Sequence, residues 1–227
     1  MSTCMSKIRK FLASLPPGEP FSTQSCVQYG SRSAIDQSIA LLIKKNVLER
    51  LVRGVFVDSD TRKHVYTAEE IAKVKLRAFG NEIVQPGSSC AKERGLQRDL
   101  CGGEDSLKDG EGVHEFLTSG HSTRFRFGEG YIYLRKCNGR KIQLSDSRVG
   151  KTVRALWFLQ QLSITLEIIY KQILTFERND FVELVGKARL MPAWLRDRIV
   201  GAFNMRWQRT VFTQSIRKRE LCVIDSC

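Results

Sequence analysis

Apolar residues in the N-terminal segment recur at helical spacing. The first stripe consists of Ile8, Phe11, Leu12 and Leu15. It predicts a helix over residues 6–15, which Pro16-Pro17-Gly18 ends. Ser22 is then a suitable N-cap for a short helix that runs to about Tyr29, and Gly30 supplies a turn.

A second amphipathic helix is predicted from Ser31 to about Lys45. Its apolar face consists of Ile35, Ile39, Leu42 and Ile43. The opposite face carries Ser33, Gln37, Ala40 and Lys44, with Arg32 at the N-terminal end. After Asn46 the apolar residues no longer follow helical spacing. Residues 47–57 predict a β-hairpin that turns at Arg53-Gly54.

This order of helix, short helix, turn, helix and hairpin predicts a winged helix-turn-helix DNA-binding domain over residues 1–57. In that layout the last helix enters the major groove and the wing contacts the flanking backbone or minor groove. We expect Arg32 to contact a guanine edge or a phosphate, Gln37 an adenine and Ser33 a phosphate. Four more residues are placed as sequence-independent phosphate contacts: Lys44, Lys45, Arg50 and Arg53. The alternatives are a merely solvated basic face and a protein-protein module.

The remaining residues predict a second, larger domain. Residues 58–66 are polar without apolar periodicity and are interpreted as a linker to a domain over 67–227. Thr67 caps a predicted helix, residues 82–84 form a short strand and residues 88–96 another helix. Residues 100–113 form a loop rich in glycine and acidic residues.

From His114 onward the pattern first predicts strands and then helices. The strands span 114–118, 123–127, 131–135 and 141–144, with glycine-containing turns between them. Helices are expected at 152–161, 162–174, 179–188 and 192–203. The fold class is therefore α+β: an N-terminal winged helix-turn-helix, then an α+β domain with a small antiparallel sheet and a helical C-terminal part over 162–227.

Charge narrows the class of partner. The 227 residues carry a net charge of +13, and basic side chains outnumber acidic ones about two to one in residues 1–66 and 151–227. A surface this basic indicates either a polyanionic partner, of which nucleic acid is the commonest, or a role of the charge in solubility. Residues 67–150 are nearly neutral, so we expect the DNA contacts to lie at the ends of the chain.

The cysteines and the leading residues favour a cytoplasmic protein. Seven cysteines are scattered without a C-x-x-C pair, which is typical of free thiols in a reducing compartment. The first fifteen residues have no apolar core long enough for a secretory signal. The most apolar stretch, 153–174, is interrupted by Arg154, Glu167 and Lys171, so it predicts amphipathic helices instead of a membrane span.

Catalytic and metal-binding patterns are weak, and we expect no enzyme activity, metal or cofactor. The three histidines, His64, His114 and His121, are too separated for a zinc site, and Cys222 and Cys227 make a poor ligand pair. Cys90 and Cys137 have no histidine near them in the sequence and are interpreted as packing residues.

One segment resembles a phosphate-binding loop. Residues 145–152 end in Gly150-Lys151-Thr152 and lie between a predicted strand and a predicted helix. However, Ser145 replaces the first glycine, which lets such a loop wrap its amides around a phosphate. Nucleotide hydrolysis or transfer through this segment remains an alternative of another class.

Several segments together resemble a known family, the AbiEi-type (type IV) bacterial antitoxins. They are 30–36, 51–56, 67–72, 85–96, 115–120, 150–156 and 190–196. The resemblance matches Ser31, Arg32 and Ser33 to the start of the family's recognition helix, and Arg50 and Arg53 to its wing. Residues 100–113 depart from the family, which has a short apolar stretch there.

The resemblance implies an N-terminal domain that represses its own operon at inverted repeats. It also implies a C-terminal domain that counters a nucleotidyltransferase-like toxin without forming a stable complex with it. The expected partner is double-stranded operator DNA, bound by a homodimer or cooperatively on repeats because a single recognition helix buries little surface. A stand-alone transcriptional regulator without a toxin is the alternative within the DNA-binding class.

Overall fold

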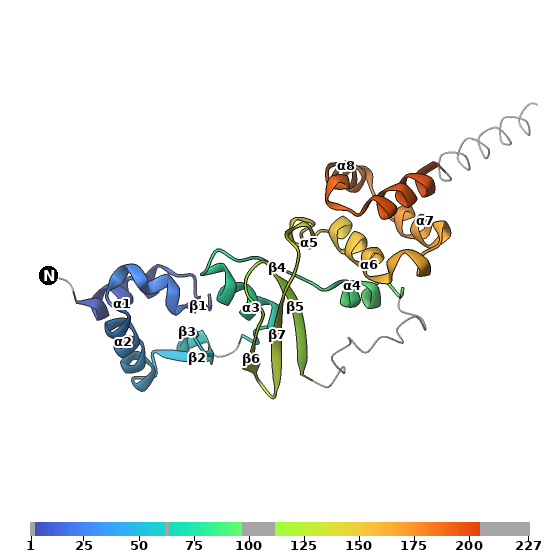
Figure 1. Ribbon diagram of the computed structural model, residues 1–227. Coiled ribbons are helices and arrows are strands. Elements are labelled where there is room, and N and C mark those ends of the chain that lie inside the picture. The colour runs from blue at the N-terminus through green and yellow to red at the C-terminus, as the bar shows by residue number, and fades with distance from the viewer. Residues whose placement is uncertain (1–2, 62–63, 97–111, 205–227) are drawn as a thin grey trace, which may run out of the picture. The chain divides into compact units, whose positions relative to one another are not determined.

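The computed structural model describes residues 3–61, 64–96 and 112–204 (Figure 1). The chain divides into two compact units, Met1–Val84 with Glu104–Asn138 and Gln85–Gly103 with Gly139–Cys227. Most of the predicted loop at 100–113, the Cys222–Cys227 pair and the basic tail lie outside the described residues.

Three helical segments form the N-terminal part of the first unit. They are α1 (Cys4–Ser14), the 3-10 helix η1 (Thr23–Tyr29) and α2 (Arg32–Lys44). Each begins at a hydroxyl N-cap, and Ser22 caps η1 as the sequence predicts. Ile8, Ile35 and Leu42 are fully buried between them, so the predicted apolar stripes are confirmed.

A three-stranded antiparallel sheet follows, in the order β1-β3-β2. It consists of β1 (Phe21–Ser22), β2 (Leu48–Val52) and β3 (Val55–Asp58). The predicted turn at Arg53-Gly54 is confirmed, and Gly54 adopts a φ of +85°, which a residue with a side chain rarely tolerates.

The second sheet of this unit has four strands in the order β4-β5-β7-β6. The strands are β4 (Ile83–Val84), β5 (Val113–Thr118), β6 (Thr123–Phe127) and β7 (Gly130–Lys136). The outer pairs are antiparallel, but β5 and β7 pair in parallel. The sheet is therefore not purely antiparallel, because β6 lies at the edge and β7 returns beside β5.

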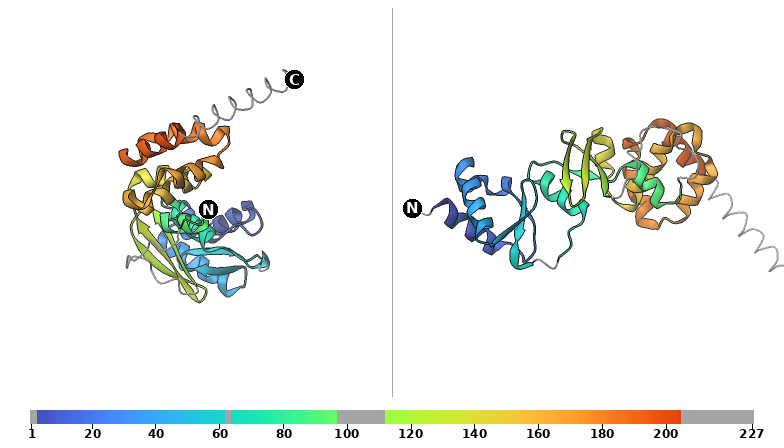
Figure 2. Two further views of the ribbon diagram at one scale, coloured as in Figure 1. Left: turned by 90° about the vertical axis from the view of Figure 1, so that its right-hand side faces the viewer. Right: turned by 90° about the horizontal axis from the view of Figure 1, so that it is seen from below.

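Helix α3 (Ala68–Arg77) packs on one face of this sheet (Figure 2). Its predicted cap at Thr67 forms a full capping box with Glu70. Val52 and Val55 of the hairpin share a core with Ile71 of α3 and Ile132 of β7. The expected boundaries at 57 and 67 therefore do not coincide with the compact units, because the hairpin and α3 bury the same apolar surface.

The described part of the second unit is helical. It contains α4 (Gly87–Glu93), α5 (Gly139–Gln143), α6 (Arg148–Ser163), α7 (Leu166–Leu174), α8 (Arg178–Gly186), the 3-10 helix η3 (Ala188–Leu190) and a final helical stretch over 193–204. The α+β class with a helical C-terminal part is thus confirmed.

The strand predicted at 141–144 is wrong, because residues 141–143 belong to α5 and Leu144 lies in the turn that follows it. Ile142 and Leu144 are both buried, and two apolar residues at spacing two fit a strand and a helical turn equally well. Ser145 then leaves the helical region with a φ of +57°.

A buried arginine connects the segments of this unit. Arg154 on α6 is 1% exposed, forms an ion pair with Asp146, and donates to the backbone oxygens of Gln85 and Ser145. Its guanidinium is therefore satisfied by acceptors from two separate segments, as a buried charge requires.

Candidate nucleic-acid interface

All eight residues predicted to contact DNA are exposed. They are Ser31, Arg32, Ser33, Gln37, Lys44, Lys45, Arg50 and Arg53. The first six of these residues, from Ser31 to Lys45, lie on α2 or directly beside it, and they share an exposed stripe with Asp36, Ala40 and Leu41. This stripe, which we call the α2 face, exists because Ile35, Ile39 and Leu42 turn the other side of the helix into the core.

Polar groups at the N-terminal end of α2 are arranged by the cap and by one ion pair. The Ser31 Oγ accepts from the Ala34 N–H at 3.4 Å and so serves as N-cap. The Arg32 Nε donates to Asp36 Oδ2 at 3.1 Å, one turn along the helix. Among the described residues no other group accepts a hydrogen bond from Arg32, so both terminal nitrogens remain available to a ligand.

Asp36 was missed by the sequence analysis as a partner of this face. Its i,i+4 spacing from Arg32 was the available signal. The pair is exposed, with 63% and 54% of the two side chains accessible, so it orients Arg32 more than it stabilises the fold.

At the other end of α2, Lys44 and Lys45 are exposed beside the C-terminal carbonyls. Lys45 is the C-cap residue, and its backbone N–H donates to the oxygen of Leu41 at 3.0 Å. Cations at this end also interact favourably with the helix dipole. These lysines thus have a stabilising role whether or not they contact phosphate.

The hairpin tip is held in place by a lysine that the sequence analysis did not single out. Lys75 of α3 donates from Nζ to the backbone oxygen of Arg53 at 2.6 Å and lies 4.5 Å from the centre of the Phe125 ring. Burial, followed by the nearby Arg53 charge, lowers the pKa of Lys75 below its ordinary value. The contact fixes the backbone at Arg53 while the Arg53 side chain remains exposed.

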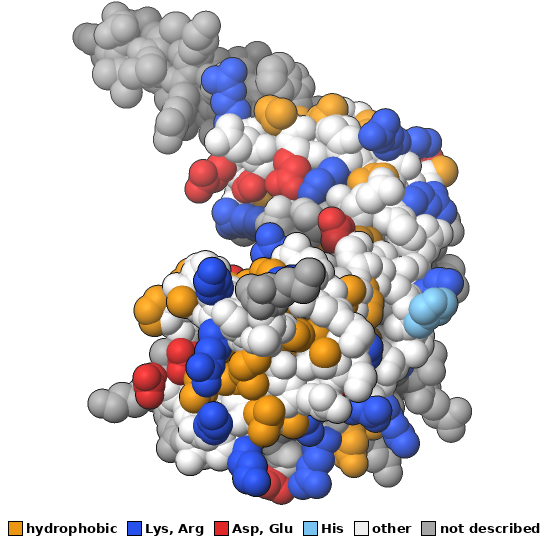
Figure 3. All heavy atoms as spheres, turned by 90° about the vertical axis from the view of Figure 1, so that its left-hand side faces the viewer, with side chains coloured by type: hydrophobic (Ala, Val, Ile, Leu, Met, Phe, Trp, Pro, Cys, Tyr) orange, Lys and Arg blue, Asp and Glu red, His pale blue; other side chains and the backbone are white. Residues whose placement is uncertain are grey.

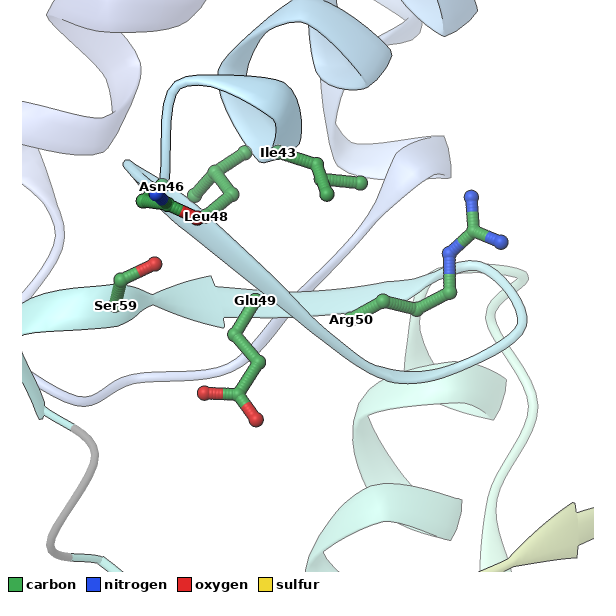
Figure 4. Close-up of a pocket in the computed structure, with 6 residues that line it drawn as sticks. All are labelled: Ile43, Asn46, Leu48, Glu49, Arg50 and Ser59. Carbon is green, nitrogen blue, oxygen red and sulfur yellow. The ribbon is translucent and has the colours of Figure 1, made fainter.

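Arg50 lies at the rim of a pocket of about 390 Å³ between the end of α2 and β2 (Figure 4). Its guanidinium carbon is 5.5 Å from the centre of the Phe56 ring on the paired strand. Figure 4 shows the Glu49 and Arg50 side chains on opposite sides of β2. Arg50 thus lies on β2 and Arg53 in the turn that joins β2 to β3, so the eight predicted residues are divided between α2 with its flanking residues and the hairpin.

Helix α1 adds basic side chains that the sequence analysis did not assign. Lys7, Arg9 and Lys10 are exposed. The view of the α1 and α2 end of the chain shows Lys and Arg side chains predominating over acidic ones (Figure 3). This distribution suits a polyanion.

The segment 145–152 has a structural explanation. It follows α5 instead of a strand, and the Ser147 Oγ accepts from the Gly150 N–H and caps α6. A Cβ at Gly150 would lie 2.0 Å from the Leu144 backbone oxygen, so backbone packing alone requires the glycine. The Lys151 Nζ lies 3.5 Å from Glu93.

Among the other candidate reactive groups, the thiols of Cys26 and Cys90 are buried, whereas Cys137 is only partly buried. Burial raises the pKa of the Cys26 thiol to about 11 and also raises that of Cys90. Within the described ranges no three acidic, histidine or cysteine side chains are grouped to hold a metal ion. No helix in the same ranges is long and apolar enough to cross a membrane.

Comparison with protein-family models, curated protein sequences and solved structures finds no match to this chain.

Proposed function

We propose that this chain is a sequence-specific regulator of transcription that binds duplex DNA through a winged helix-turn-helix. In this proposal α2 is the recognition helix and the β2–β3 hairpin is the wing. The α2 face carries the proposal: its first two turns present an oriented guanidinium, a hydroxyl and an amide from Arg32, Ser33 and Gln37. These are the donor groups that read guanine and adenine edges and contact phosphates.

The remaining basic residues supply affinity independent of sequence. Lys44 and Lys45 lie at the far end of α2, and Arg50 and Arg53 lie on the hairpin. If they and one further residue neutralise about five phosphates, log K falls with log salt at a slope of roughly −4 to −5.

We further propose that the regulated operon is the chain's own and that it acts as an AbiEi-like antitoxin, which the sequence resemblance supports. In this proposal the protein binds repeats upstream of its gene and counters a nucleotidyltransferase-like toxin without a stable complex. Rescue of growth by this chain in cells that express such a toxin is the expected result; persistent arrest would leave a stand-alone regulator.

Fluorescence anisotropy with the full chain tests the DNA proposal. The probe is the duplex upstream of the gene, and the competitor is a scrambled duplex of equal length. We expect at least about 10³-fold preference for the upstream duplex. Gln37→Ala should reduce that preference, whereas Lys171→Ala, an exposed lysine of α7 paired with Glu167, serves as the matched control. Equal binding of both duplexes would contradict sequence-specific recognition.

A further inference from the structure

The face of the four-stranded sheet opposite α3 carries an alternation of arginine and tyrosine. On β7, Ile132 and Leu134 are buried toward α3, so Tyr131, Tyr133 and Arg135 lie on the other face. On β6, Phe125 and Phe127 pack toward α3, and Arg124 and Arg126 lie on the same face as the tyrosines. We call these five residues the Arg-Tyr face.

Strand register places each tyrosine directly beside an arginine. Tyr133 is paired with Arg124, and Tyr131 with Arg126. The two tyrosine rings have centroids 6.3 Å apart and are tilted by 54°, so they are not stacked on each other. Tyr131 is 44% exposed and Tyr133 is half-buried, so both rings are accessible to a ligand at least in part.

The charges of this face are only partly neutralised. Arg135 forms an ion pair with Glu115 of β5 at 2.9 Å. Arg126 lies 4.0 Å from Glu129, whose side chain is fully exposed, and this pair is weak. Within the described residues Arg124 forms no ion pair. With three arginines against Glu115 and Glu129, the face has a net positive charge.

We propose that the Arg-Tyr face binds a single-stranded nucleic acid, with bases stacked on Tyr131 and Tyr133 and phosphates contacted by Arg124 and Arg126. Aromatic rings beside cationic side chains are the combination that binds unpaired bases and their backbone without strong sequence preference. A duplex keeps its bases stacked inside, where rings on a sheet face cannot reach them. This site is separate from the α2 face and does not depend on the function proposed for it.

The test uses the full chain and two fluorescent twelve-residue probes, oligo(U) and oligo(dT), in anisotropy titrations. We expect Tyr131→Ala and Tyr133→Ala each to weaken binding about tenfold, because a stacking platform is lost. Tyr131→Phe and Tyr133→Phe should bind within about threefold of the parent, since the ring is kept. Binding of oligo(U) alone identifies RNA as the ligand. Binding of both probes shows that the face accepts single-stranded RNA and single-stranded DNA.

Arg124→Gln should lower the salt slope by about 0.7 for single strands and leave the upstream duplex unaffected. Arg53→Ala should lower the salt slope for the duplex and leave binding of the single strands unaffected. Failure of this proposal is therefore distinguishable from failure of duplex recognition. The proposal is overturned if neither probe binds, or if the alanine variants bind as tightly as the parent. It is also overturned if the phenylalanine variants lose as much affinity as the alanine variants while their thermal melts match the parent.

Discussion

Arg32 and Asp36 form an ion pair on the exposed side of α2, with the Arg32 Nε 3.1 Å from Asp36 Oδ2. The contact uses the one guanidinium nitrogen that is not needed for a bidentate grip on a guanine. Asp36 thus holds the arginine at the N-terminal turn of the helix with its two terminal nitrogens free of other described groups. An exposed pair of this kind contributes little to stability but reduces the freedom that Arg32 loses on binding.

Arg32→Ala should therefore weaken binding to the operator by about 1–3 kcal/mol and weaken random duplex less. Arg32→Lys should recover part of the affinity but not the specificity, because an ammonium cannot make the bidentate contact. Anisotropy on both duplexes measures this, and Asp36→Asn is the companion variant, expected to lose specificity less than Arg32→Ala. Equal losses on the two duplexes would show that Arg32 contacts phosphate instead of a base.

Arg53→Ala should weaken all duplex sequences about equally and reduce the salt slope by about one unit. The reason is that the side chain is exposed at the hairpin tip, while Lys75 holds the backbone through the Arg53 carbonyl and the substitution leaves that carbonyl in place. Titrations at several salt concentrations measure the slope. A loss confined to one base pair would mean that the wing reads sequence.

Much of the first unit could be predicted from the sequence because its signals are local. The caps at Ser22 and Thr67, the apolar stripes and the Arg53-Gly54 turn all lie within a few residues of the structure they specify. The exposure of the α2 face followed from the same periodicity. The i,i+4 spacing of Arg32 and Asp36 is a local signal of the same kind.

What the sequence could not supply depends on tertiary pairing. The parallel pairing of β5 with β7, and the Lys75 contact to Arg53, join residues far apart in the chain. The sequence predicts a strand at 141–144, where the structure has the end of α5, because two apolar residues at a spacing of two fit a strand and a helical turn equally well. The shared core of Val52 and Ile71 likewise has no local signal.

Replacing Arg154 should destabilise the chain strongly. Arg154→Met removes a buried guanidinium together with its ion pair with Asp146 and its hydrogen bonds to the partly buried Gln85 and Ser145 carbonyls. Breaking a buried pair in this way costs about 3–5 kcal/mol. Urea denaturation followed by circular dichroism measures the loss, and Arg196→Met, an exposed arginine of the same unit, is the control. A change below about 1 kcal/mol would show that the pair is dispensable.

The capping box of α3 predicts a pH dependence of stability. The Thr67 backbone N–H donates to Glu70 Oε2 at 2.8 Å, and the Thr67 hydroxyl donates to the same oxygen at 3.0 Å. These bonds lower the pKa of the Glu70 carboxyl below its ordinary value, the backbone bond having the larger effect. Because the pKa is lower in the folded chain than in the unfolded one, the carboxylate stabilises the fold above the unfolded pKa. That contribution is lost as the pH falls through the folded value.

Glu70→Gln keeps a hydrogen-bond acceptor at the third helical position but cannot titrate. We therefore expect the difference in melting temperature between parent and variant to be largest near pH 7 and to shrink as the pH falls from about 5 to 3. Glu69→Gln, which removes the exposed pair with Lys73 on the same turn, is the matched control and should show a smaller pH dependence. Thermal melts at half-unit pH steps measure the curves. Parallel curves for the parent and Glu70→Gln would show that the Glu70 carboxylate contributes nothing to the stability of α3.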